Sequence, residues 1–197
     1  MAQQHPPPPQ LARPCSDAST SARCSRVRSH TRSVADPAQM TDIARTLREK
    51  LAALTKLGLT VTVRNNRMVI QLPGDVLFDS GKETLKKEGE SILLKVAEVI
   101  RNDAGLSSRS FQVAGHTDNV PTGKNSRFKS NWELSSQRAL TVLDLMVKEG
   151  MDAKRLSAAG YADVLPVATN DTDDGKRQNR RIEIVLQPNI EDLPGID

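Results

Sequence analysis

Apolar residues recur with a period of two in two neighbouring stretches of this chain, residues 59–63 and 68–72. In both stretches a large apolar side chain occupies every second position. This period is typical of β-strands with one buried face. The residues between them, 64–67, read Arg-Asn-Asn-Arg, and Asn tolerates a positive φ. The pattern therefore predicts a tight β-hairpin.

Two longer stretches have the apolar spacing of amphipathic helices. Residues 84–102 place apolar side chains on one helical face. The second stretch, residues 130–149, begins with Ser130 and carries Glu133 three positions later. This spacing matches a capping box at the start of a helix. Gly150 follows the last periodic residue and predicts the end of that helix.

A shorter amphipathic helix is predicted for residues 41–58. Ile43, Leu47, Leu51 and Leu54 recur at helical spacing, with charged residues between them. Such a helix either packs on the domain that follows or is the end of a linker from an upstream element. The sequence is compatible with both arrangements.

Three short apolar stretches are predicted strands, at residues 110–115, 156–161 and 181–186. A polar loop at 119–129 follows the first, and a short turn of helix is expected between the last two. Strands that alternate with helices after an N-terminal hairpin predict a fold of the α/β (α+β) class. We expect a two-layer sandwich, with helices on one face of a mixed β-sheet.

The front of the chain has a different composition. Residues 1–38 are rich in Pro, Ser, Arg and Gln and contain few large apolar side chains. Such a segment cannot offset the entropy lost on ordering, so its composition predicts disorder. We therefore divide the chain into a tail at 1–40, a linker helix at 41–58, a folded domain at 59–187 and a C-terminal tail at 188–197.

Composition and charge limit the classes of partner. The chain has 197 residues, of which 37% are hydrophobic and 3% aromatic, which suits one domain of moderate size. Its net charge is +4, but residues 1–40 hold five Arg and two Asp, so only +1 remains for residues 41–197. A folded part that is nearly neutral argues against a nucleic-acid partner.

No export signal or membrane anchor can be read in the sequence. No apolar run approaches the roughly 20 residues that span a bilayer, or the roughly 7–15 that form a signal-peptide core. Met40 lies just before the first periodic segment, so we expect a truncated or misassigned N-terminus. Cys15 and Cys24 lie in the low-complexity front, outside any CxxC motif. We interpret them as incidental thiols rather than zinc ligands.

Polar groups that could bind a ligand lie near the ends of the predicted elements. Asp118 follows a strand, where a rigid scaffold holds loop residues. Asn131 and Arg138 are two helical turns apart, so their side chains project from one face. Arg138 and Asp118 are therefore expected to form a paired site, in which the planar guanidinium suits a carboxylate ligand. From the residues alone, a purely structural ion pair is an equally good interpretation.

Several short motifs follow one another in a specific order along residues 68–187. They are Gly115-His116-Thr117-Asp118, the run Asn131–Ala139, Gly160-Tyr161, Pro166, Asn170 and Asn179-Arg180-Arg181. In this order and spacing the chain resembles the OmpA-like C-terminal (peptidoglycan-binding) domain family. The long loop before Asn131 and the Ser-Asn-Trp-Glu-Leu-Ser run resemble the MotB-type branch most closely.

The resemblance implies a module that binds bacterial peptidoglycan non-covalently, through the diaminopimelate of its peptide stem. Diaminopimelate carries an ammonium and a carboxylate on one carbon. The resemblance implies that Asp118 receives the ammonium and Arg138 the carboxylate. It further implies that Thr117, Asn131 and Arg180 add hydrogen bonds or charge. Such a domain anchors an envelope protein to the cell wall and requires no cofactor.

Three positions depart from the family pattern. Ala162 stands where Gly is usual, Lys176 replaces a common Arg, and Gly81 occupies a position where some members have Asn. The last departure puts a ligand contact at Gly81 in doubt. None of the three alters the Asp118 and Arg138 pair.

The resemblance also implies a location and partners. It places the protein in the periplasm or cell envelope, associated with the outer membrane, with membrane contact only through an upstream segment. Peptidoglycan is the expected partner, a homodimer is left open, and no nucleic acid is expected. The alternative is a MotB-like flagellar motor stator component. Two less favoured alternatives are nucleic-acid binding through the Arg-rich arm at 13–32 and peptidoglycan hydrolysis.

The sequence favours a binding module over an enzyme. It has no nucleophile elbow, HExxH motif, P-loop or Cys/His pair. His116 is the only histidine of the predicted domain, so we expect no metal site and no general base there. We interpret Trp132 as a packing residue rather than a sugar-stacking platform. Because Arg180 and Arg181 alternate across a strand, one of them is expected to be solvated.

Overall fold

The computed structural model describes residues 37–187, apart from residues 66 and 125. The predicted tails at 1–40 and 188–197 lie outside these residues, except for residues 37–40, and so do both cysteines. Within the described range, no helix combines the length and apolarity needed to cross a membrane.

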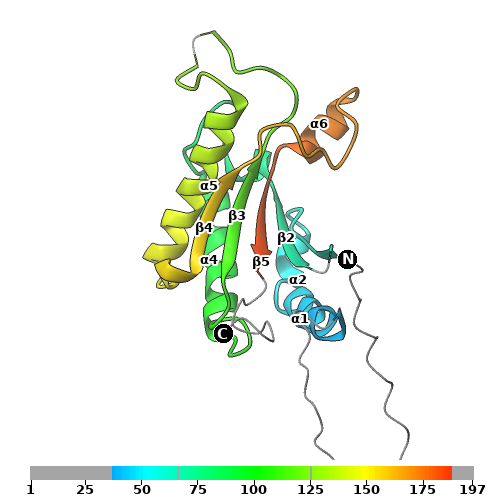
Figure 1. Ribbon diagram of the computed structural model, residues 1–197, viewed down its shortest axis with the longest axis vertical. Helices are drawn as coiled ribbons and strands as arrows, with labels where there is room; N and C mark the ends of the chain where they lie inside the picture. The colour runs from blue at the N-terminus through cyan, green and yellow to red at the C-terminus, as the bar shows by residue number, and fades with distance from the viewer. Residues whose placement is uncertain (1–36, 66, 125, 188–197) are drawn as a thin grey trace, which may run out of the picture. The chain divides into compact units, whose positions relative to one another are not determined.

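Five strands form one mixed sheet in the order β1-β2-β5-β3-β4 (Figure 1). β3 and β4 pair in parallel, and the other neighbouring pairs are antiparallel. The strand that is last in sequence therefore lies in the middle, between the hairpin and the parallel pair. The strands are β1 (Thr60–Arg64), β2 (Arg67–Pro73), β3 (Phe111–His116), β4 (Leu156–Gly160) and β5 (Arg181–Leu186).

The hairpin prediction is confirmed. β1 and β2 are antiparallel neighbours, and Arg64 pairs with Arg67 across the turn. Asn65 has a φ of 50°, a left-handed conformation that Asn adopts more readily than most residues.

Helices cover one face of the sheet, as predicted. Apolar side chains of α1, α4 and α5 form a single hydrophobic core with those of β2, β3 and β5. Figure 1 shows α4 and α5 together on the same side of β3 and β4. The predicted fold class is thereby confirmed. The helices are α1 (Pro37–Lys50), α2 (Ala52–Thr55), α3 (Gly74–Leu77), α4 (Lys87–Asn102), α5 (Asn131–Lys148) and α6 (Asp173–Asn179), with a 3-10 turn at Ala153–Arg155.

The N-terminal helix packs on the sheet. Leu47, Leu51 and Leu54 are buried in the common core. Arg48 Nε also donates a hydrogen bond to the carbonyl of Val61 in β1, at 2.7 Å. Of the two arrangements compatible with the sequence, the structure shows packing on the domain. The helical segment begins before the predicted residue 41 and ends at Thr55 rather than residue 58.

The helix predicted for residues 84–102 begins at Lys87 instead. Its first apolar residue, Leu85, forms an antiparallel bridge with Phe78. This pairing holds the backbone before Lys87 extended, and it fixes the segment 78–86 that later forms one wall of the site.

The start of α5 is fixed by its cap and by close packing. The side chain of Ser130 accepts a hydrogen bond from the Glu133 amide at 3.3 Å. The Glu133 carboxylate accepts one from the Lys129 amide at 2.7 Å. A Cβ atom at Gly115 would lie 2.1 Å from the Ser135 carbonyl oxygen, so only glycine lets α5 approach β3 this closely. These contacts place the N-terminal half of α5 over the end of β3.

Candidate functional site

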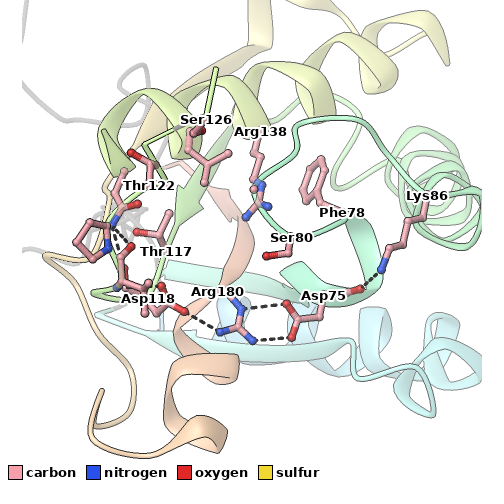
Figure 2. Close-up of a pocket in the computed structure, with 16 residues that line it drawn as sticks. Asp75, Phe78, Ser80, Lys86, Thr117, Asp118, Thr122, Ser126, Arg138 and Arg180 are labelled. Carbon is pink, nitrogen blue, oxygen red and sulfur yellow. Dashed lines mark hydrogen bonds and ion pairs between the residues drawn. The ribbon is translucent and has the colours of Figure 1, made fainter. Parts of the chain in front are cut away.

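A pocket of about 770 Å³ opens where β3 ends. Its walls come from the loop after β3, the start of α5, the segment 75–86 and the residue before β5. All five predicted site residues line this pocket: Thr117, Asp118, Asn131, Arg138 and Arg180. Figure 2 shows Asp118 and Arg180 on one side and the Arg138 guanidinium pointing into the same space.

Asp118 is nearly buried at the rim of the sheet, with 7% of its surface exposed. One carboxylate oxygen, Oδ2, accepts a hydrogen bond from Arg180 Nη1 at 2.7 Å. The other, Oδ1, accepts one from the Val120 amide at 3.2 Å. The carboxylate is therefore held in a fixed orientation by its own loop and by the residue before β5.

Arg180 joins Asp118 to a second carboxylate, that of Asp75. Its Nε and Nη2 donate to the two Asp75 oxygens at 3.0 and 2.8 Å, a bidentate pair (Figure 2). The hydrogen bond with Asp75 raises the pKa of Arg180 and lowers that of Asp75. Sequence reasoning missed Asp75, because it lies 105 residues from its partner on a different element. No periodicity or motif joined the two.

The alternative interpretation, a structural ion pair between Asp118 and Arg138, is wrong, although both residues line the pocket. The ion-pair partner of Asp118 is Arg180. Arg138 instead donates from Nε to the Lys82 carbonyl at 2.8 Å and from Nη2 to the Asp79 carbonyl at 3.1 Å. Arg180 precedes β5 and competes for the Asp118 carboxylate, which the helical spacing of α5 could not reveal.

Arg138 is a buried cation without a carboxylate partner among the described residues. It is 6% exposed, and its guanidinium lies 5.0 Å from the centre of the Phe78 ring. Burial lowers its pKa, although nearby Asp75 opposes the shift. Within residues 37–187 as described, no carboxylate oxygen forms an ion pair with it. Backbone carbonyls satisfy two of its donors but supply no full negative charge.

Asn131 and Thr117 frame the pocket. Asn131 Nδ2 donates to the carbonyls of Asp118 and Val120, at 3.2 and 3.0 Å. Asn131 thus supports the loop that carries Asp118. The buried Thr117 hydroxyl has no hydrogen-bond partner among the described residues. Thr117 lines the pocket, but its hydroxyl oxygen has almost no accessible surface.

Neither of the two neighbouring arginines is fully solvated, although one of them was expected to be. The side chain of Arg180 is 30% exposed, and Arg181 is only 3% exposed. Its Nε donates to the Glu183 carboxylate at 2.7 Å, and its terminal nitrogens donate to two backbone carbonyls. Arg181 is a buried structural residue on the face of the sheet away from the helices.

His116 is buried beside the pair formed by Arg181 and Glu183. Its ring stacks on Tyr161 at 5.3 Å, and neither ring nitrogen has a hydrogen-bond partner in the described part of the chain. Burial, reinforced by the charge of Arg181, lowers its pKa from 6.5 to about 4, so the ring is neutral at pH 7. No group of three metal-ligating side chains occurs among the described residues. The packing role expected for Trp132 is wrong, because 51% of it is exposed.

Comparison with known proteins decides the family. Residues 77–180 match the OmpA family. This chain belongs to the OmpA family. The predicted family and its MotB-type character are thereby confirmed, since motility protein B of Bacillus subtilis (strain 168) is 36% identical over 136 residues. That alignment covers 68% of this chain and 47% of the relative.

Two further relatives of this OmpA-family chain extend the likeness. The probable lipoprotein YiaD of Escherichia coli (strain K12) is 36% identical over 142 residues, which cover 72% of this chain and 60% of the relative. The chain therefore spans about half to three fifths of these two curated relatives. The solved cell wall anchor of the T6SS from Pseudomonas aeruginosa has 35% identity and a TM-score of 0.65. That match covers 73% of this chain and 97% of the solved one.

Proposed function

We propose that this domain binds bacterial peptidoglycan non-covalently, by holding the zwitterionic end of diaminopimelate in the pocket. The observation that carries the proposal is the buried Arg138 guanidinium, which has no carboxylate partner among the described residues. A buried charge without a counter-ion is costly. A ligand carboxylate that docks on Arg138 removes this cost and forms charge-assisted hydrogen bonds.

The opposite side of the pocket suits the ligand ammonium. Asp75, Arg180 and Asp118 carry two negative charges and one positive charge, so this group has a net charge of −1. The ligand's ammonium and carboxylate share one carbon, and the pocket offers a net negative group and a separate cation. Thr117 also lines the pocket, and its hydroxyl has no hydrogen-bond partner among the described residues. The site is thus complementary to a zwitterion and neutral overall when the ligand is bound.

Membership in the OmpA family and similarity to a cell wall anchor support the role of anchoring an envelope protein. The protein then acts in the cell envelope, and we infer an association with the outer membrane. A modest affinity is sufficient, because peptidoglycan repeats the ligand and avidity multiplies weak contacts. The role does not depend on a homodimer, although two copies would increase this avidity.

A flagellar stator role is the second candidate. The similarity to motility protein B favours it. Peptidoglycan hydrolysis is disfavoured by the electrostatics of the pocket. A glycosidase needs a carboxylic acid with a raised pKa, whereas the pKa of Asp75 is lowered by Arg180. No step of the proposed binding involves a metal or a cofactor.

Co-sedimentation of the full chain with purified diaminopimelate-type peptidoglycan tests the proposal. Asp118→Ala and Arg138→Ala are compared with the charge-matched surface variants Asp144→Ala and Arg45→Ala. We expect the wild type and both surface variants to pellet and both pocket variants to remain in the supernatant, with unchanged circular dichroism. A folded wild type that stays in the supernatant would contradict the function, and pelleting of both pocket variants would contradict the site.

A further inference from the structure

A backbone contact accompanies the bidentate pair of Asp75 and Arg180. Asp75 lies at the start of α3, and the amide of the preceding Gly74 donates to the Arg180 carbonyl at 2.7 Å. A Cβ atom at Gly74 would lie 2.8 Å from that carbonyl oxygen. The two chain segments therefore touch at the backbone as well as through their side chains. Arg180 has little freedom to turn away from Asp75.

The same contact affects the net charge that a ligand meets at Asp118. Arg180 donates two hydrogen bonds to Asp75 and one to Asp118. If Asp75 were neutral, the positive charge of Arg180 would be balanced by Asp118 alone. The three side chains would then carry no net charge, and the attraction for an ammonium group would fall.

We propose that Asp75 is a positioning residue: its bidentate pair holds the Arg180 guanidinium and so leaves the Asp118 carboxylate open to the ligand ammonium. This inference rests on the proposed function of the pocket. Arg180 then has a defined part: it orients the Asp118 carboxylate while Asp75 balances its charge. Asp75 acts through Arg180 and needs no contact with the ligand.

A direct role is the competing explanation. Asp75 lines the pocket, and its side chain is 46% exposed, so it has room to meet a ligand itself. The two explanations differ in their dependence on Arg180. Without Asp75, the donors of Arg180 that now bond Asp75 are free to turn onto Asp118 and occupy its carboxylate. This effect requires the guanidinium and disappears in the Arg180→Gln background, whereas a direct contact or a structural role of Asp75 remains.

The test is a double-mutant cycle on the full chain with Asp75→Asn, Arg180→Gln and the double variant. The probe is a soluble disaccharide tripeptide that ends in meso-diaminopimelate, titrated by calorimetry. We expect Asp75→Asn to weaken binding about tenfold in the wild-type background and less than about twofold in the Arg180→Gln background. Thermal unfolding of each variant shows that it is folded.

An equal loss from Asp75→Asn in both backgrounds would overturn the inference, because Asp75 would then act directly or structurally. No loss in the wild-type background would overturn it as well. Failure of the proposed function gives a different result, since neither the wild type nor Arg180→Gln would bind the tripeptide.

Discussion

Two arginines with almost the same burial occupy two regions of this domain and have opposite surroundings. Arg138 lies in the pocket at the end of β3, and Arg181 lies on the face of the sheet away from the helices. They are 6% and 3% exposed, and burial lowers the pKa of both. Arg181 has the Glu183 carboxylate at 2.7 Å. Among the described residues, Arg138 bonds only to backbone carbonyls, and its guanidinium lies over the Phe78 ring.

The difference separates a structural charge from a binding charge. Burial acts to raise the pKa of Glu183, but hydrogen bonds and charges from Arg181 and Arg64 outweigh it, and the pKa lies below its usual value. That cluster is balanced within the fold. In the pocket, no carboxylate of the described residues forms an ion pair with Arg138, and we propose that a ligand carboxylate takes this place. Burial alone therefore does not identify a ligand-binding arginine, and we propose that burial without an internal counter-ion does.

The largest expected effect comes from breaking the structural pair. Arg181→Ala leaves Glu183 buried with Arg64 as its remaining ion-pair partner, and we expect it to lower the free energy of unfolding by about 3–5 kcal/mol. Urea unfolding at pH 7 measures this loss. Below its transition the variant should bind peptidoglycan as the wild type does, and a selective loss of binding in a stable variant would contradict the division of roles.

The next effect is a pH dependence in the same region. The folded pKa of His116 is about 4, below the 6.5 expected when unfolded, so the unfolded chain binds the extra proton first. The contribution of His116 to the free energy of unfolding is fully present above pH 6.5. It falls by about 3 kcal/mol as the pH drops toward 4. Urea unfolding of wild type and His116→Gln between pH 7 and 4 gives the difference. Parallel curves would show that His116 is not buried as a neutral ring.

Arg138→Met should separate binding from stability. Replacing an uncompensated buried cation with an apolar side chain is expected to change the free energy of unfolding by less than about 1 kcal/mol. The same change removes the partner of the ligand carboxylate and should weaken binding about 10- to 100-fold. Unfolding and tripeptide titration are measured on one preparation. A loss of several kcal/mol in stability would mean that Arg138 is structural, like Arg181.

The smallest effect concerns Ala162, in the loop after β4. Ala162 has a φ of 47°, which costs a non-glycine residue about 1 kcal/mol, and its carbonyl accepts the Thr117 amide at 2.8 Å. Ala162→Gly relieves the strain but loses a buried methyl group, so we expect a gain of about 0.5 kcal/mol in stability. Thermal unfolding measures the gain, and tripeptide affinity should stay unchanged. A clear destabilisation would show that the methyl packing outweighs the backbone strain.

Local patterns predicted the parts of this molecule that local physics determines. The hairpin turn at Asn65 and the cap at Ser130 depend on residues within four positions, and the structure has both. The five site residues were predicted to lie together and do line one pocket. Their binding roles stay predictions until they are tested.

What could not be predicted depends on tertiary contacts between distant residues. Arg180 bonds to Asp75 across 105 positions and to Asp118 across 62. Helical spacing placed Arg138 beside Asp118 but could not tell which arginine would take the carboxylate. A long arginine side chain can reach several carboxylates, and the fold determines which of them lie near it. The sequence pattern alone therefore does not predict the pairing.

The most direct test of the central claim is to remove the ligand carboxylate that Arg138 is proposed to bind. The probes are the meso-diaminopimelate tripeptide and the same peptide with the carboxylate of its zwitterionic end amidated. For the wild type we predict that amidation weakens binding about 10- to 100-fold. For Arg138→Met we predict that amidation changes the affinity less than about twofold. If the variant distinguishes the two peptides as well as the wild type does, Arg138 does not bind the carboxylate and the account is wrong.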